Sequence, residues 1–267
     1  MSAVLVERAD GYAVVTLNRP DVRNAIDEEV LTGLRKAFAE LDADPETGAI
    51  VLTGADPAFC AGLDLRKLGS GTQKLGIGSR EDIEASVGPW GRPLLTPVIG
   101  AINGATVTGG LEIALNCDIL IASERARFAD THARVGVMPG WRLTTLLPEA
   151  VGRGLARRMS LTGDFLTAEQ ALRAGLVTQV VPHAELLPAA RTVAATIAAN
   201  DRTSVRTLLG SYHRVDDALL TAADEVEFTT SRTWAGREIA PEEVERRRQA
   251  ITDRGRAQNA SPSSPTG

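Results

Sequence analysis

The stretch from Asn103 to Asp118 reads N-G-A-T-V-T-G-G-L-E-I-A-L-N-C-D, and the rest of the chain is organised around it. It follows the apolar run 97–102, so we expect a buried strand that ends at Asn103-Gly104 and a helix that begins at Gly109-Gly110. Two glycines at a helix start let a ligand approach the backbone, and the unpaired N–H groups there favour a developing negative charge. The stretch therefore predicts a strand-turn-helix junction suited to an anionic group.

Glu112 comes about one turn into the predicted helix. From this place its carboxylate can point into the same cleft, which sets a candidate base beside a candidate anion hole. An acidic residue in a first turn also favours the helix by itself, and Gly-Gly can simply close a turn. Both interpretations fit this stretch taken alone.

A second stretch favours the chemical interpretation. Residues 59–65 read F-C-A-G-L-D-L, and they follow the predicted strand 49–54 through the turn-rich segment 55–58. Another backbone bend therefore lies at the end of a strand. Two such bends can supply two N–H donors to one ligand atom.

Three further motifs complete the pattern, namely L-N-R-P at 17–20, N-A at 24–25 and G-V-M-P-G at 136–140. Together with the two stretches above they resemble the crotonase, or enoyl-CoA hydratase/isomerase, superfamily. The resemblance runs from about Val4 to Arg248. The F-C-A-G-x-D-L and N-G-x-x-x-x-G-G-x-E elements are specific as a set in this order, although neither is convincing alone.

The resemblance implies an α/β fold, a crotonase-like spiral of repeated ββα units with a helical C-terminal region that forms a homotrimer or a dimer of trimers. It also implies a coenzyme A thioester as substrate. The carbonyl oxygen of this thioester would receive N–H bonds from residues that match Ala61 and Gly109. Ala25, Gly62, Leu63 and Asp64 lie in the matching motifs and are candidate contacts with coenzyme A or the acyl group, and the resemblance assigns the family's basic position to Arg66. Arg23 is a further candidate because a phosphorylated cofactor needs a local positive charge, and a solvated surface charge is the open alternative.

The second catalytic position departs from the family pattern. In well-known hydratases of this family a second glutamate follows the equivalent strand, and here His132 occupies the matching position in the predicted loop 130–134. This departure puts the mechanism with two glutamates in doubt. An imidazole can still exchange protons near neutral pH, so His132 is a candidate partner of Glu112. A loop histidine with a purely structural role is the open alternative.

Composition bounds the class of protein. The 267 residues are 43% hydrophobic and 24% charged, with a net charge of −5, which suits a soluble enzyme and argues against nucleic acid as a partner. We see neither a signal peptide nor an apolar run of about 18 residues, so we expect a cytoplasmic protein that does not bind membranes. Cys60 and Cys117 suggest a reducing compartment, and neither belongs to a metal-binding cluster. Cys60 is more simply a small core residue than a nucleophile.

Local patterns place the remaining elements. We expect a hairpin around Asp10-Gly11, a helix from Asp27 to Asp44, and a capping box at Thr167. Residues 69–93 are glycine-rich and are either a candidate lid or an exposed connecting loop with no role, and Trp90 is a packing residue. Residues 1–200 are the predicted spiral core, 201–254 the helical trimerisation region, with helices at 204–209 and 216–232, and 255–267 a disordered tail.

Two bulky residues after Pro139-Gly140 also depart from the pattern. Trp141 can narrow the acyl pocket. Arg142 can bind a substrate carboxylate or, as the simpler alternative, form an ion pair within the protein. We therefore expect an enzyme that adds water to a 2-enoyl-CoA thioester through Glu112 and His132 and needs no further cofactor. Isomerisation by one base, and acyl-CoA binding without catalysis, are the alternatives.

Overall fold

Two β-sheets form the frame of the protein, whose computed structural model describes residues 2–65, 88–234 and 241–260. The larger sheet has the strand order β1-β2-β3-β5-β7-β10, and only its first pair is antiparallel. The smaller sheet has the order β4-β6-β8-β9, with β9 antiparallel to β8. The strands are β1 Val4–Arg8, β2 Tyr12–Leu17, β3 Ala49–Gly54, β4 Ala58–Cys60, β5 Val98–Ile102, β6 Ala105–Val107, β7 Ile119–Ser123, β8 Arg127–Ala129, β9 Leu166–Thr167 and β10 Gln179–Val181.

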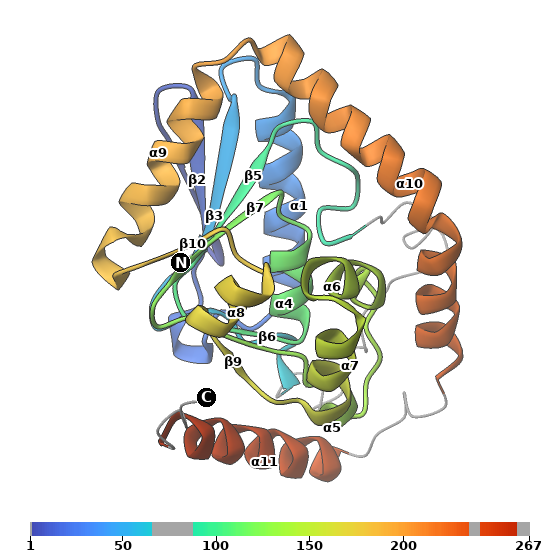
Figure 1. The fold of residues 1–267 in the computed structure, drawn as a ribbon. Coiled ribbons are helices and arrows are strands. Elements are labelled where there is room, and N and C mark those ends of the chain that lie inside the picture. Colours follow the sequence, from blue (N-terminus) through green and yellow to red (C-terminus); the bar gives the residue numbers. More distant parts are fainter. Residues whose placement is uncertain (1, 66–87, 235–240, 261–267) are drawn as a thin grey trace.

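The chain winds through these sheets in successive turns of a spiral. β3, β5 and β7 each enter the larger sheet, and the strand that follows each of them enters the smaller one. A helix completes the turns of β5 and β7, which gives the ββα spiral expected from the sequence (Figure 1). The helices are α1 Glu28–Ala43, α4 Gly109–Leu115, α5 His132–Val135, α6 Leu143–Val151, α7 Arg153–Thr162, α8 Ala168–Ala174, α9 Leu186–Ala198, α10 Arg202–Thr233 and α11 Pro241–Ala260, with 3-10 turns at Pro20–Val22 and His183–Glu185.

Two short strands of the smaller sheet, β4 and β6, were not predicted, whereas a short strand at 126–129 was predicted and is present as β8. β4 and β6 each have three residues, and β6 lies between Ile102 and Gly109, where the sequence indicates a turn alone. Three residues are too few to show an alternating pattern, and both strands form only because distant segments pair with each other. The predicted loop at Asp130–Arg134 likewise contains the short helix α5.

The apolar core lies between the larger sheet and α1. β3 and β5 are buried along their whole length, and α1 contributes Val30, Leu34 and Phe38 from one face. The ring of Trp90 stacks on Phe38 with a centroid distance of 4.3 Å, which confirms its packing role. The Asp27 carboxylate caps α1 by accepting the Val30 N–H at 3.0 Å.

α9 covers the other face of the larger sheet and buries a second apolar cluster there (Figure 1). The predicted capping box of α8 is present, because Thr167 and Gln170 each bond to the backbone of the other. In the described ranges, no helix is both long enough and apolar enough to cross a membrane.

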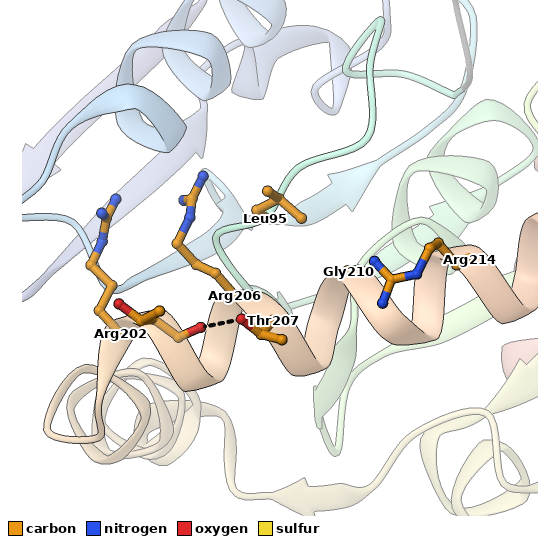
Figure 2. A pocket seen from close by; sticks show the side chains of 7 residues that line it. Leu95, Arg202, Arg206, Thr207, Gly210 and Arg214 are labelled. Atoms are coloured by element: carbon orange, nitrogen blue, oxygen red, sulfur yellow. Dashed lines mark hydrogen bonds between the residues drawn. The ribbon is translucent and has the colours of Figure 1, made fainter.

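α10 is one helix of 32 residues, where the sequence predicted two helices with a break. It runs along the outside of the molecule, drawn in orange in Figure 1. Figure 2 shows the side chains of Arg202 and Arg206 projecting from α10, where they bond to the Asp44 carbonyl and to Asp42 at the end of α1. These arginines line a groove of about 430 Å³. Because the same side chains anchor α10 to the end of α1, we assign the groove to the packing of this helix.

α11 extends to Ala260 and is therefore longer than the predicted helical region, which ended at Arg254. The rest of the predicted tail, 261–267, lies outside the described residues. Most of the candidate lid at 69–93 also lies outside them, since the description resumes at Gly88.

Candidate active site

Close contacts fix the start of α4. A Cβ atom on Gly110 would lie 2.2 Å from the Cys60 carbonyl oxygen, so a larger residue does not fit there. Thr108, directly before α4, has φ 55°, and its N–H donates to the Ala129 carbonyl at 3.0 Å. The hydroxyls of Thr108 and Thr131 lie 2.5 Å apart, which ties the start of α4 to that of α5. These contacts hold Thr108 in a backbone conformation that is costly for any residue with a Cβ.

One of the two predicted N–H donors of the anion hole is already engaged. The Ala61 N–H donates to the carbonyl oxygen of Arg23 at 3.0 Å. A thioester oxygen would have to replace this bond, so the predicted role of Ala61 conflicts with the structure. The reason is tertiary, because residues 61–64 lie alongside residues 23–26 and share backbone bonds with them.

The Leu63 N–H is better placed for that role. Ile26 donates to the Gly62 carbonyl at 2.8 Å and accepts from the Asp64 N–H at 2.9 Å, so Leu63 directs its own N–H to the opposite side. Within the described part of the chain, neither the Leu63 N–H nor the Gly109 N–H has an acceptor. The two segments touch, since the Gly109 nitrogen lies 3.4 Å from the position that a Cβ on Gly62 would take.

Glu112 is buried and held in one orientation. Its Oε1 atom accepts the Gly140 N–H at 2.9 Å and the Trp141 N–H at 2.7 Å. Its Oε2 atom lies 3.9 Å from the position that a Cβ on Gly109 would take. The structure thus brings the candidate base next to the candidate anion hole, and Oε2 is the oxygen that faces it.

His132 lies between two carboxylates. Its Nε2 atom is 3.4 Å from Glu112 Oε2, and its Nδ1 atom is 2.6 Å from Asp130 Oδ1. Burial by itself would lower the pKa of His132, but the hydrogen bonds and charges of Asp130 and Glu112 outweigh burial and raise this pKa to about 10. This rise favours the imidazolium form of His132, which is a proton donor.

Asp130 fixes the imidazolium in turn. Its Oδ1 atom also accepts the backbone N–H of His132 at 3.1 Å. Although burial opposes ionisation, the contacts with His132 hold the pKa of Asp130 below its usual value. Asp130, His132 and Glu112 therefore form a row of three contacting polar side chains, with the imidazole between the two carboxylates.

The residues expected to contact coenzyme A are brought together in part. Ala25 is buried, Gly62 has a φ of +86° that suits glycine, and the Arg23 side chain is exposed. Leu63 is half-buried beside them. Arg66 lies outside the described residues.

Asp64 has a structural role in this region. It is buried, and its Oδ2 atom pairs with Arg19 Nη2 at 3.0 Å. Arg19 also pairs with Asp27 at 3.2 Å and donates to the Ala25 carbonyl at 2.6 Å. The acidic residue of the A-G-x-D motif therefore holds two loops together through Arg19.

Two residues with reactive or charged groups have structural roles here. Cys60 is fully buried, and desolvation raises the pKa of its thiol to about 12, which agrees with the core role inferred from the sequence. Arg142 Nε lies 3.0 Å from Asp224 Oδ2, so the ion pair is the alternative that the structure supports.

A second polar chain links Ser123, His183 and Asp56. The Ser123 hydroxyl lies 3.0 Å from His183 Nδ1, and His183 Nε2 lies 3.1 Å from Asp56. The order resembles a nucleophile, base and acid, but Ser123 is completely buried and its oxygen already accepts the Arg125 N–H. This chain joins the end of β7 to the turn before α9.

Sequence reasoning missed three parts of the site. Asp130 stands two residues before His132 and received no role, although an Asp-x-His spacing is a usable signal. The amides of Gly140 and Trp141 were missed because backbone donors carry no side-chain signature. Glu227 on α10 accepts bonds from residues 142 and 144, and nothing in its sequence neighbourhood indicates this. Among the described residues, no group of three or more His, Cys, Asp or Glu could hold a metal ion.

Comparison with known proteins places the chain among proteins of one family. Residues 7–240 match the family described as enoyl-CoA hydratase/isomerase. The crystal structure of enoyl-CoA hydratase from Mycobacterium smegmatis is 51% identical, with a TM-score of 0.78 over 87% of this chain and 97% of that one.

Two relatives known by sequence are similar over most of their length. "Probable enoyl-CoA hydratase 1, peroxisomal" of Arabidopsis thaliana is 39% identical over 73% of this chain and 72% of its own. The (E)-benzylidenesuccinyl-CoA hydratase of Thauera aromatica is also 39% identical, over 76% of this chain and 79% of its own. Both names describe a hydratase that acts on a CoA compound.

Proposed function

This chain belongs to the enoyl-CoA hydratase/isomerase family, and we propose that it adds water to the double bond of a 2-enoyl-CoA thioester. One observation carries the proposal. The Oε2 atom of the buried Glu112 lies next to both His132 Nε2 and the backbone of Gly109. A base, an acid and an N–H donor therefore meet at one point, as acid-base attack on a conjugated thioester requires.

The thioester oxygen would bind between the N–H groups of Leu63 and Gly109. Negative charge grows on this oxygen as water attacks C3, so the two donors stabilise the transition state more than the ground state. The Leu63 amide takes the place first given to Ala61, whose N–H is bonded to Arg23. Coenzyme A would follow the surface of Arg23, Ala25 and the segment 62–65, and no further cofactor takes part.

Protons balance through the Glu112 and His132 pair. The water oxygen bonds to C3, Glu112 Oε2 accepts the proton of the water, and the electrons of the double bond move to C2 and the thioester oxygen. The imidazolium of His132 gives a proton to C2, and Glu112 returns a proton to His132 across the 3.4 Å contact. With its pKa raised to about 10, His132 is in the charged form that this step needs.

The test is product analysis with purified protein and a panel of 2-enoyl-CoA and 3-enoyl-CoA thioesters. Hydration consumes the absorbance of the conjugated thioester and adds the mass of one water to the product. A product of unchanged mass from the 3-enoyl substrate, with no hydration of the 2-enoyl substrate, would overturn the proposal.

Isomerisation of the double bond is the second candidate. The observation that favours it is the replacement of a second carboxylate by an imidazolium, because one base can shuttle a proton between two carbons without consuming water. Tight binding of the whole panel with no change in any thioester would instead favour a binding protein without catalysis.

The assembly we propose is a homotrimer or a dimer of trimers, with α10 at the contact between copies. The large apolar side chains on the outer side of this helix recur at intervals of four, three, four and seven residues, which places them on one face. An exposed seam of this kind is stabilised when another protein surface covers it. Its members are Leu208, Tyr212, Val215, Leu219 and Val226.

We further propose that the enzyme works in the cytoplasm. Both cysteines are free thiols, one buried and one half-buried, as a reducing compartment favours. Fractionation of cells that produce the protein tests this, and recovery with the membrane or an organelle would contradict it.

A further inference from the structure

Glu227 is the one buried residue among those described on α10. Burial raises its pKa above the usual value, the bond from Thr144 opposes this, and the charge of Glu112 adds to the rise. A buried carboxylate is costly unless several donors satisfy it. The inner side of α10 therefore has to meet hydrogen-bond donors from the rest of the protein.

The donors all come from the segment 140–144, which precedes and begins α6. Glu227 Oε1 accepts the Arg142 N–H at 2.7 Å, and Oε2 accepts the Thr144 N–H and hydroxyl at 2.5 Å each. Arg142 has a φ of 69°, which a residue with a side chain keeps only when its surroundings impose it. Glu227 is the group that bonds to the backbone on both sides of this strained turn.

The same segment holds the candidate base. The N–H groups of Gly140 and Trp141 donate to Glu112 Oε1, and the next amides along the chain donate to Glu227. One short piece of backbone is thus bonded on one side to a carboxylate of the spiral core and on the other side to a carboxylate of α10. Residues 142–144 follow directly on the two amides that orient Glu112, so their position bears on where these amides point, although Asn116 Nδ2 also holds the Trp141 carbonyl at 3.0 Å.

We propose that Glu227 is a positioning residue for the reaction, and that it acts on Glu112 through the backbone of residues 140–144. It keeps Glu112 Oε1 bonded to the two amides, so that Oε2 faces His132 and the substrate. Glu227 does not touch the substrate in this arrangement. The inference rests on the proposed function, in which Glu112 is the base.

The experiment compares two variants on one helix. Glu227→Ala removes the bonds to the backbone of 142 and 144, and we expect kcat to fall about 10-fold to 100-fold with little change in KM, the scale of a misplaced catalytic group. Glu227→Gln keeps one acceptor oxygen and should recover part of the loss. Asp224→Ala is the matched control, because Asp224 lies one turn away and, among the described residues, its polar contacts are with the side chains of Arg142 and Thr145.

A double-mutant cycle separates positioning from general destabilisation. If Glu227 acts through Glu112, adding Glu227→Ala to Glu112→Gln should lower kcat little further, since the step it supports is already lost. Equal factors in both backgrounds, or a Glu227→Ala enzyme with kcat within about twofold of wild type, would overturn the proposal.

Hydrogen exchange gives a readout that does not depend on turnover. The amides of Gly140 and Trp141 should exchange faster in Glu227→Ala than in Asp224→Ala, and unchanged exchange would overturn the inference. A wild-type protein that turns over no thioester would contradict the proposed function instead, while the exchange comparison would still decide the role of Glu227.

Discussion

The spiral core and α10 are held in opposite ways. In the core, α1 and the strands of the larger sheet bury continuous apolar faces. α10 is twice as long as α1 but places a carboxylate inward and large apolar side chains outward. Hydrophobic burial stabilises the core, whereas charge-assisted contacts fix α10 in one place. α10 therefore belongs to the site through its inner carboxylate, whereas its outer apolar face is the proposed contact between copies.

The largest expected effect comes from the carboxylate buried in the core. Glu112→Gln should lower turnover by roughly two to four orders of magnitude, the range for a lost acid-base group. The amide oxygen can keep the bonds to Gly140 and Trp141, but its NH₂ group then faces the His132 imidazolium, which donates as well. Steady-state kinetics with circular dichroism as the folding control measures this. Turnover near the wild-type value would remove Glu112 from the mechanism.

Truncation of an apolar side chain to alanine should lower the free energy of unfolding much more in the core than on the outer face of α10. Phe38 is fully buried and stacked on Trp90, so Phe38→Ala should lower the free energy of unfolding by about 3–5 kcal/mol. Leu219 is 71% exposed, and Leu219→Ala should change the same quantity by no more than about 0.5 kcal/mol in a dissociated chain. Denaturant unfolding at low protein concentration tests the pair. Similar losses of unfolding free energy in both variants would contradict the view that hydrophobic burial stabilises the core but not the outer face of α10.

Assembly is the place where the outer face of α10 should matter. Leu219→Asp puts a charge at the centre of the exposed seam, and we expect the association of copies to weaken by about 1.5–3 kcal/mol per buried leucine while the fold of each copy persists. Light scattering across a dilution series measures the change. Arg202→Lys, on the same helix but away from the seam, is the control. Unchanged assembly in Leu219→Asp would move the interface elsewhere.

The last expected effect is a gradual pH trend that belongs to the core. The folded pKa of His132 lies above its unfolded value, so its stabilisation is complete below about pH 6.5 and is lost as the pH rises toward 10. The slope is at most about 1.4 kcal/mol per pH unit. The difference in unfolding free energy between wild type and His132→Gln should shrink over this window. A difference independent of pH between 7 and 10 would mean that His132 is not held as the imidazolium.

Local signals in the sequence were sufficient for much of the frame. The hairpin around Asp10-Gly11, the Asp27 cap of α1 and the glycines before Glu112 are each contained in a few consecutive residues, and each is present in the structure. The pairing of Glu112 with His132 was also predicted, from the family pattern, and the structure brings them to 3.4 Å. Their chemical roles remain proposals.

Only the tertiary structure decided which backbone groups are free and which carboxylates are buried. Ala61 and Leu63 look equally able to donate an N–H in the sequence, but the contact with residues 23–26 engages Ala61 alone. Glu227 lies far along the chain from Glu112, and the two meet through the segment 140–144 because α10 folds back over it. The physical reason is that periodicity and turn chemistry act over a few residues, whereas hydrogen-bond satisfaction of a buried group depends on which distant segments pack against it.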